Sequence, residues 1–282
     1  MAIGVATLGI FALPCCSVAL MAAPQAGIER IREKGELTVA VFSEDVPPFF
    51  YKDETGTLAG IDPILAQDIA SKLGVGLVYN RSAATFDGVV DEVATGRADI
   101  AVSLISDTLD RAMRVSFSKS YVSVRQFLLI NRLELGKLTA GSGVLGADLP
   151  IPRLLDNPGV RIGVIGGTSY VGFLAEDFPK AERVEFGGWD DMLAAVKAGD
   201  LAALMYDEIE VGNWRKADPA GSLDLKPLHL AGHSDTIAIA INKGDDDLKA
   251  WIDLYLQKVE DNGFLPSLLN THLYTSDRAL ND

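Results

Sequence analysis

From residue 36 onward the sequence alternates between short apolar runs and amphipathic stretches, and this rhythm constrains the fold more than any other feature. Short apolar runs predict buried strands, and apolar residues three or four positions apart predict helices. The alternation indicates an α/β fold with mainly parallel sheets. The expected strands cover residues 37–42, 99–105, 126–131, 160–165, 201–206 and 236–241, and the expected helices cover 87–96, 168–177, 190–198 and 247–262.

Local signals place one further helix and one break in the rhythm. The helix is expected to begin at Asp62, with this carboxylate as N-cap and Pro63 in the first helical position. Gly74 is expected to end it, because glycine readily adopts the left-handed conformation of a helix C-terminus. Residues 133–159 are rich in glycine and proline, so we expect a loop or a short excursion there.

Charge and motif content exclude several classes of protein. The chain has 282 residues and a formal net charge of −14, which argues against binding to nucleic acid or to an anionic membrane surface. It contains no phosphate loop, nucleotide fingerprint or Gly-x-Ser-x-Gly elbow. His229, His233 and His272 do not stand at metal-ligand spacing. We therefore expect neither a metal site nor a cofactor.

The N-terminus predicts export. Residues 1–28 carry no charged side chain, and an apolar run ends in small residues at 22–26. This pattern favours a signal peptide over residues 1–26, and a retained membrane anchor is the alternative. Cys15 and Cys16 are the only cysteines, so a cleaved protein would have neither a disulfide nor a thiol.

A carboxylate site is predicted where the strand 99–105 ends. Ser106 stands five positions before Arg111. A planar guanidinium can give a carboxylate two parallel charge-assisted hydrogen bonds, and a hydroxyl can give a third. Alternatively, Arg111 is a solvated residue that pairs with Asp107 or Asp110, and Ser106 or Thr108 is only a helix N-cap. We favour Ser106 as a ligand contact and Thr108 as a cap.

This stretch resembles the signature of the solute-binding proteins of ABC transporters for polar amino acids, in which Ser/Thr-x-Thr-x-x-Arg leads into Val-x-Phe-Ser-x-x-Tyr. The matching residues are Ser106, Thr108, Arg111, Val115, Phe117, Ser118 and Tyr121. The resemblance covers about residues 32–275. It implies a type II periplasmic-binding-protein fold with two lobes, each a mainly parallel sheet flanked by helices. The implied ranges are 29–127 plus 236–282 for lobe 1, 132–230 for lobe 2, and segments near 127–132 and 231–236 for a two-segment hinge.

The same resemblance implies the function. Proteins of this family capture an amino acid or a similar small carboxylate between two closing lobes and deliver it to an ABC permease in the membrane. We therefore expect a monomeric, periplasmic binding protein without enzymatic activity.

The resemblance also assigns roles to individual residues. It implies that Arg111 and Ser106 hold the ligand's carboxylate, that Thr168 adds a contact from lobe 2, and that Asp207 pairs with the α-ammonium. Thr168 is otherwise an N-cap after Gly166-Gly167, and Asp207 is otherwise a solvated acid at a strand end. Glu208 and Glu210 follow closely, so the sequence leaves open which acid points inward.

Phe49 and Phe86 fall where the family places aromatic walls, and Glu44 lies on the same loop as Phe49, where relatives read the ligand side chain. Aromatic residues at such positions are equally often part of the core, and a loop acid is usually solvated. Two positions depart from the family. Leu104 stands where a glycine is common, and Val46 replaces an aromatic residue.

An enzyme is the alternative function. Cyclohexadienyl dehydratases resemble solute-binding proteins and convert prephenate or arogenate, with a general acid in an Asp-x-x-Glu segment. Here Asp207-Glu-Ile-Glu210 fits that segment, which would make Glu210 the acid. Their Gly-Gly-Thr-Asn-Glu run differs, because Ser169 and Tyr170 follow Thr168 in this chain.

Overall fold

A computed structural model describes residues 27–141 and 150–274. The expected signal peptide and both cysteines lie outside this part. The strands are β1 (Glu36–Ala40), β2 (Tyr51–Lys52), β3 (Leu58–Ala59), β4 (Gly76–Asn80), β5 (Ile100–Ala101), β6 (Ser116–Asn131), β7 (Arg161–Ile165), β8 (Glu182–Phe186), β9 (Ala203–Asp207) and β10 (Leu225–Ile241).

The helices lie between these strands and at the two ends of the described chain. They are α1 (Gly27–Lys34), α2 (Ile61–Leu73), α3 (Phe86–Ala94), α4 (Leu109–Ala112), α5 (Arg132–Gly141), α6 (Ile151–Leu155), α7 (Tyr170–Asp177), α8 (Trp189–Ala198), α9 (Glu208–Ala217), α10 (Asp246–Asp261) and α11 (Phe264–Leu269), with short 3₁₀ and π turns at Gly221–Asp224 and Asn270–Tyr274.

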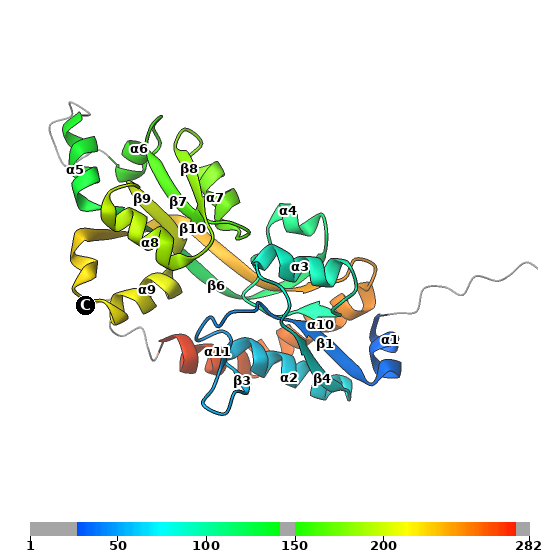
Figure 1. Cartoon of the computed structure of the whole chain (residues 1–282). Coiled ribbons are helices and arrows are strands. Elements are labelled where there is room, and N and C mark those ends of the chain that lie inside the picture. The colour runs from blue at the N-terminus through cyan, green and yellow to red at the C-terminus, as the bar shows by residue number, and fades with distance from the viewer. Residues whose placement is uncertain (1–26, 142–149, 275–282) are drawn as a thin grey trace, which may run out of the picture.

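Eight strands form one mixed sheet in the order β4-β1-β5-β10-β6-β9-β7-β8. β1 is parallel to β4 and β5, and β7 is parallel to β8 and β9. β10 is antiparallel to β5 and β6, and β6 is antiparallel to β9. The prediction of an α/β fold is confirmed. The prediction of two separate, mainly parallel sheets is wrong, because the antiparallel pair β6–β10 joins the two parallel groups into a single sheet (Figure 1).

The long central strands connect two hydrophobic cores. Buried apolar residues of 31–124 and 237–273 form one group of clusters, and those of 128–230 form the other. The pairing of β10 with β6 is interrupted between His229 and Ser234. Figure 1 shows the same division, with α1–α4, α10 and α11 around one end of the sheet and α5–α9 around the other. The segments expected to form a hinge lie in β6 and β10, with residue 132 at the start of α5.

The secondary structure differs from the prediction at several points. Each expected strand and helix has a counterpart, but β2, β3, β4, β8, α1, α9 and α11 were not predicted. The segment 133–159, expected to be a loop, contains most of α5 and all of α6. The N-cap prediction for α2 is also wrong, because Gly60 is the N-cap and Asp62 is a fully buried residue of the first turn. Gly74 ends α2 in the left-handed conformation, as predicted.

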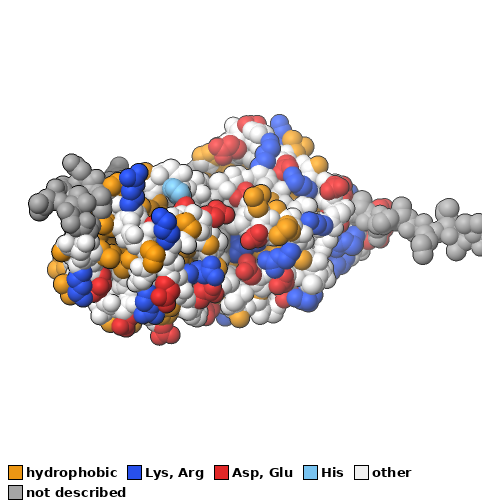
Figure 2. Space-filling view, turned by 90° about the horizontal axis from the view of Figure 1, so that it is seen from above, with side chains coloured by type: hydrophobic (Ala, Val, Ile, Leu, Met, Phe, Trp, Pro, Cys, Tyr) orange, Lys and Arg blue, Asp and Glu red, His pale blue; other side chains and the backbone are white. Residues whose placement is uncertain are grey.

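The surface carries charges of both signs. Figure 2 shows acidic and basic side chains interspersed over one face, although the chain as a whole is strongly acidic. Within residues 27–141 and 150–274, no helix is both long and apolar enough to span a membrane.

Substitution of Gly60 tests how tightly the backbone is packed at the start of α2. Its φ is 115°, and an added Cβ would lie 2.7 Å from the carbonyl oxygen of Pro48 and even closer to that of Phe49. We expect Gly60→Ala to lower the free energy of unfolding by about 3 kcal/mol or more, because backbone strain and a backbone clash add together. Gly74→Ala is the matched control, since φ is 74° and the space around it is open, and we expect a loss of about 1 kcal/mol. Equal urea midpoints for the two variants would contradict this view of the packing.

Candidate functional site

A cavity of about 210 Å³ lies where the two groups of parallel strands face each other with their carboxyl ends. Residues just beyond β1, β5 and β7, and at the end of β9, line it. The carboxyl ends of strands are where open α/β sheets bind ligands. The cavity is smaller than the ~300–1,000 Å³ of sites for drug-sized molecules, so its size suits a small solute.

Arg111 is buried in the wall of this cavity, with only 3% of its surface exposed. Its Nε donates a hydrogen bond to Asp87 Oδ1 at 3.0 Å, and one terminal nitrogen donates to the carbonyl of Ser106 at 3.3 Å. The other terminal nitrogen, Nη2, is buried and has no partner among the described residues. The alternative in which Arg111 is a solvated partner of Asp107 or Asp110 is therefore wrong.

Thr108 has the role that the sequence predicted for it. Its hydroxyl accepts a hydrogen bond from the backbone of Arg111 and so caps α4. The cap holds the first turn in which Arg111 lies, and thereby contributes to the position of the guanidinium.

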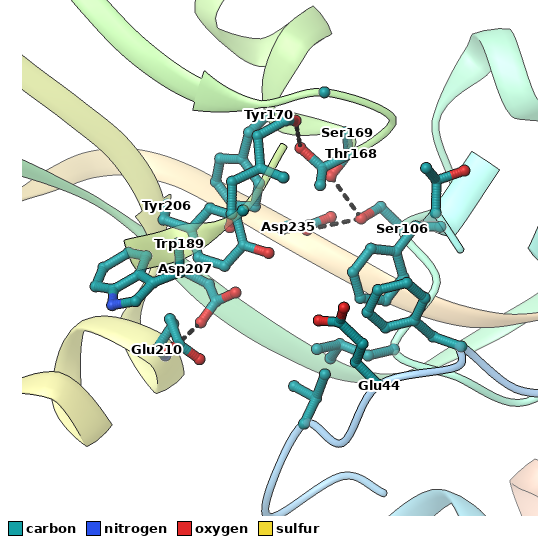
Figure 3. A pocket seen from close by; sticks show the side chains of 18 of the residues that line it. Glu44, Ser106, Thr168, Ser169, Tyr170, Trp189, Tyr206, Asp207, Glu210 and Asp235 are labelled. Atoms are coloured by element: carbon teal, nitrogen blue, oxygen red, sulfur yellow. Dashed lines mark hydrogen bonds between the residues drawn. The ribbon is translucent and has the colours of Figure 1, made fainter. Parts of the chain in front are cut away.

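Ser106 connects the two sides of the cavity. Its hydroxyl lies 2.7 Å from Asp235 Oδ2 and 2.9 Å from the hydroxyl of Ser169 (Figure 3). Asp235 belongs to β10 and is 4% exposed, whereas Ser169 precedes α7 on the opposite wall. Ser106 is therefore not a helix cap, and it lines the cavity, while its contact with a ligand stays a prediction.

The opposite wall is formed by the turn after β7. Thr168 is buried, lines the cavity and donates its hydroxyl to the carbonyl of Ile165 at 2.7 Å. Ser169, not Thr168, is the N-cap residue of α7. The backbone N–H of Asp87 donates to the carbonyl of Gly167 at 3.1 Å, so the two walls touch beside the cavity.

The sequence left open which of three acids points inward, and the structure separates them. Asp207 and Glu210 line the cavity, whereas Glu208 pairs with Arg125 at 2.6 Å. Asp207 is the N-cap of α9 and accepts the backbone N–H of Glu210 at 2.8 Å. Burial raises the pKa of Asp207 to about 6, even though this hydrogen bond opposes the shift. Burial, together with repulsion from Asp207, raises the pKa of Glu210 to about 7.

Asp235 adds a third buried acid that sequence reasoning missed. Burial raises its pKa to about 7, against the lowering effects of the Ser106 hydroxyl and the Arg111 guanidinium. Glu44, as predicted for its loop, lies at the cavity with Asp45, and both are exposed. The lining residues in the described ranges thus include several carboxylates and a single basic side chain, Arg111.

Aromatic rings cover the two ends of the cavity. Phe42 stacks on Phe86 with ring centroids 4.7 Å apart. Across the cavity Tyr206 stacks on Tyr170 at 4.9 Å and lies 5.7 Å from Trp189. Phe86 is therefore at the cavity, as predicted.

Phe49 does not line the cavity. It is fully buried in the hydrophobic core around α2, so its placement as an aromatic wall is wrong. Phe42 takes that place beside Phe86, because it directly follows the buried strand β1 and its extension at Val41.

Sequence reasoning missed a further set of lining residues. These are Phe42, Leu104 as a wall residue, Tyr170, Trp189, Tyr206 and Asp235. Trp189 could have been found from Gly187-Gly188 before an amphipathic helix, but β8 before it was not predicted. Asp235 has no comparable signal, because a single acid before an apolar strand is ordinary. No group of three or more His, Cys, Asp or Glu in the described ranges has an arrangement that would hold a metal ion.

The buried acids predict a pH dependence of stability. Asp207, Glu210 and Asp235 retain protons in the folded protein up to pH about 6 to 7, whereas they lose them near pH 4 in the unfolded chain. Between these values the folded state binds more protons, so each acid makes the free energy of unfolding fall as pH rises. We expect Asp235→Asn to reduce this fall by up to about 1.4 kcal/mol per pH unit.

Urea unfolding between pH 4 and pH 7.5 measures this difference. Asp191→Asn, on the exposed side of α8 and outside the cavity lining, is the control and should leave the slope unchanged. A wild-type slope in Asp235→Asn would show that Asp235 is ionised throughout this range.

Comparisons with known proteins agree with this geometry. Residues 37–275 match the family described as bacterial extracellular solute-binding proteins, family 3. A probable histidine-binding protein of Neisseria gonorrhoeae is 25% identical over 89% of this chain and 90% of its own length. The cyclohexadienyl dehydratase of Pseudomonas aeruginosa is 28% identical over 90% of each chain.

Solved structures show the same fold. An amino acid ABC transporter substrate-binding protein from Streptococcus pneumoniae, bound to L-arginine, is 26% identical, with a TM-score of 0.69 over 88% of this chain and 98% of its own. Because the family model covers most of the sequence and the cavity lies between the two groups of strands, the chain belongs to the family 3 bacterial extracellular solute-binding proteins.

Proposed function

We propose that this protein binds an amino acid or a similar small carboxylate in the cavity and delivers it to an ABC permease from the periplasm. The observation that carries the proposal is the buried Nη2 of Arg111, which has no partner among the described residues and borders the cavity. A buried N–H group of a guanidinium without an acceptor is costly, and a ligand carboxylate supplies that acceptor.

The remaining charges support an amino acid rather than a simple carboxylic acid. Asp207, Glu210 and Asp235 lie around the same cavity as Arg111. Their burial disfavours their ionised forms, and a ligand ammonium would relieve this cost by pairing with them. The aromatic faces of Tyr206 and Phe86 offer further surfaces for a cationic side chain. The arginine-bound relative from Streptococcus pneumoniae supports the same class of ligand.

A two-lobe mechanism accompanies the proposal. In this mechanism the described residues of lobe 1 are 29–127 and 236–274, those of lobe 2 are 132–141 and 150–230, and the hinge is near 127–132 and 231–236. The division into two hydrophobic cores and the interrupted pairing between β6 and β10 support it. The lobes close on the ligand, since Arg111 and Ser106 come from one core region and Thr168 and Asp207 from the other.

Arg111→Ala tests the carboxylate contact. We expect it to weaken binding of the responsive amino acid by at least ~2 kcal/mol, about 30-fold in Kd, because a buried charge pair loses one partner. The measurement is a thermal-shift panel of L-arginine, L-lysine, L-histidine, L-glutamine and L-cystine on the protein, followed by calorimetry. Arg161→Ala, whose side chain pairs with Glu182 on the surface away from the cavity, should bind as the wild type does. Equal affinity of Arg111→Ala and the wild type would refute the proposal.

A dehydratase activity is the second candidate, and Glu210 is the observation that favours it. Its carboxyl lines the cavity and, with a pKa of about 7, remains partly protonated near neutral pH. A protonated acid can donate its proton to a leaving hydroxyl. With prephenate, loss of carbon dioxide and of that hydroxyl as water would give phenylpyruvate. The identity to the Pseudomonas aeruginosa dehydratase supports the candidate.

Glu210→Gln tests this second candidate. If the protein is a dehydratase, the wild type converts prephenate to phenylpyruvate, and the variant loses at least ~100-fold in kcat, because general acid catalysis contributes about that factor or more. Phenylpyruvate absorbance measures the rate, and Arg161→Ala serves as the folded control. No turnover by the wild type would dismiss the enzyme and leave the binding function.

A further inference from the structure

Leu104 has a backbone conformation that leucine rarely adopts. Its φ is 50°, and it is the one non-glycine residue with positive φ in the part of the chain that the structure describes. This left-handed region places Cβ close to the following carbonyl oxygen, and glycine avoids the conflict. Leu104 is nevertheless 8% exposed and lines the ligand cavity, two positions before Ser106. A strained residue at such a place requires something that holds it.

The structure shows what holds it. The backbone N–H of Leu104 donates a 2.8 Å hydrogen bond to Oδ2 of Asp62, in the first turn of α2. The hydroxyl of Tyr121 donates to the other oxygen, Oδ1, at 2.7 Å. Asp62 is fully buried and lies outside the cavity lining, behind the wall that Leu104 forms.

Asp62 has no other evident task. It is not the N-cap of α2, because Gly60 occupies that position. No basic side chain pairs with it among the described ion pairs, and burial raises its pKa to about 7. Burying a carboxylate costs free energy unless its oxygens are hydrogen-bonded. Both of its hydrogen bonds from the protein fix neighbours of the cavity wall: the backbone of Leu104 and, through Tyr121, strand β6.

We propose that Asp62 is a positioning residue for ligand selectivity, which holds Leu104 in its left-handed conformation and so fixes the leucine side chain as a wall of the cavity. Leu104 lies beside the carboxylate anchor formed by Ser106 and Arg111. Its side chain therefore limits the space around the α-carbon of a bound amino acid and excludes substituents there. This role of Leu104 rests on the proposed binding function, whereas the role of Asp62 in the ligand-free fold does not.

Stability measurements test the role of Asp62 without any ligand. Where φ is negative, alanine is more stabilising than glycine, and where φ is positive this order reverses. We expect Leu104→Gly to have a higher urea midpoint than Leu104→Ala in the otherwise wild-type protein. In the Asp62→Ala background, Leu104→Ala should have the higher urea midpoint of the two, because the segment is free to leave the left-handed conformation.

Asp62→Asn is the matched control, since its amide oxygen still accepts the N–H of Leu104 and its amide nitrogen can donate to Tyr121. In the Asp62→Asn background, Leu104→Gly should again have a higher urea midpoint than Leu104→Ala. Asp62→Leu, which fills the space without an acceptor, replaces Asp62→Ala if the latter does not fold. The proposal would be overturned if Leu104→Ala had a higher urea midpoint than Leu104→Gly with Asp62 in place. It would also be overturned if the order of the two midpoints were the same in all backgrounds.

Selectivity is tested with L-arginine and α-methyl-L-arginine, which carries an extra methyl group on the α-carbon. The wild type should discriminate against the methylated form, and Leu104→Gly should reduce the ratio of the two Kd values at least tenfold. Asp62→Ala should also reduce this ratio, and Asp62→Asn should not. An unchanged ratio in Leu104→Gly would overturn the selectivity role. If L-arginine binds to none of the proteins, the proposed function fails for this ligand, and the order of the urea midpoints still decides the role of Asp62.

Discussion

The antiparallel pairing of β6 with β10 is the interaction on which the rest of the molecule depends. These two strands are the longest of the sheet, and each contributes residues to both hydrophobic cores. Because the parallel groups attach to opposite sides of this pair, the carboxyl ends of β1 and β5 face those of β7 and β9. A cavity between two sets of strand ends follows from that arrangement. The pairing is irregular between His229 and Ser234, and again near Ala238.

Desolvation governs the chemistry of this cavity. Arg111 is nearly inaccessible to water, and its nearest acid, Asp87, is half-exposed at the edge of the site. Neither Asp207 nor Asp235 forms an ion pair among the described residues, and burial raises the pKa of both, although the nearby Arg111 opposes the shift at Asp235. The site therefore combines an incompletely satisfied cation with acids that ionise more readily when a positive charge arrives. A zwitterion satisfies both requirements at once, whereas a simple anion satisfies only the first.

Much of the fold and part of the site could be predicted from sequence. Buried strands such as 160–165 and helices such as 247–262 have strong periodicity, and Thr108 is a residue type that favours the N-cap position. The single sheet could not be predicted, because the strand signals at 126–131 and 236–241 mark only the most apolar parts of β6 and β10. The remaining parts of these strands are polar and exposed on one side.

The site residues that were missed share a physical reason. Asp235 and Tyr206 reach the cavity through pairing partners and rings that are distant in sequence, so no local pattern marks them. Phe49 and Phe42 show the converse case, in which a residue predicted to line the cavity lies in the core and another takes its place. Both follow or precede apolar runs, but only the three-dimensional path of the loop after β1 turns Phe49 into the core and Phe42 toward Phe86. Tertiary packing, not propensity, decides between such neighbours.

The contacts that close the cavity are few and polar, and this bears on how the protein works. Across the cavity the two sides meet through the hydroxyls of Ser106 and Ser169, and through the backbone of Asp87 and Gly167. Farther out, Asn213 donates to the carbonyl of Pro47 at 3.1 Å. Such hydrogen bonds are exchanged for bonds to water when the walls separate, so each contributes only about 1 kcal/mol to the closed form. The two groups of hydrophobic clusters lie on either side of this seam. On the proposed function, a ligand that pairs with Arg111 and the buried acids would add to the free energy that these few contacts give the closed arrangement.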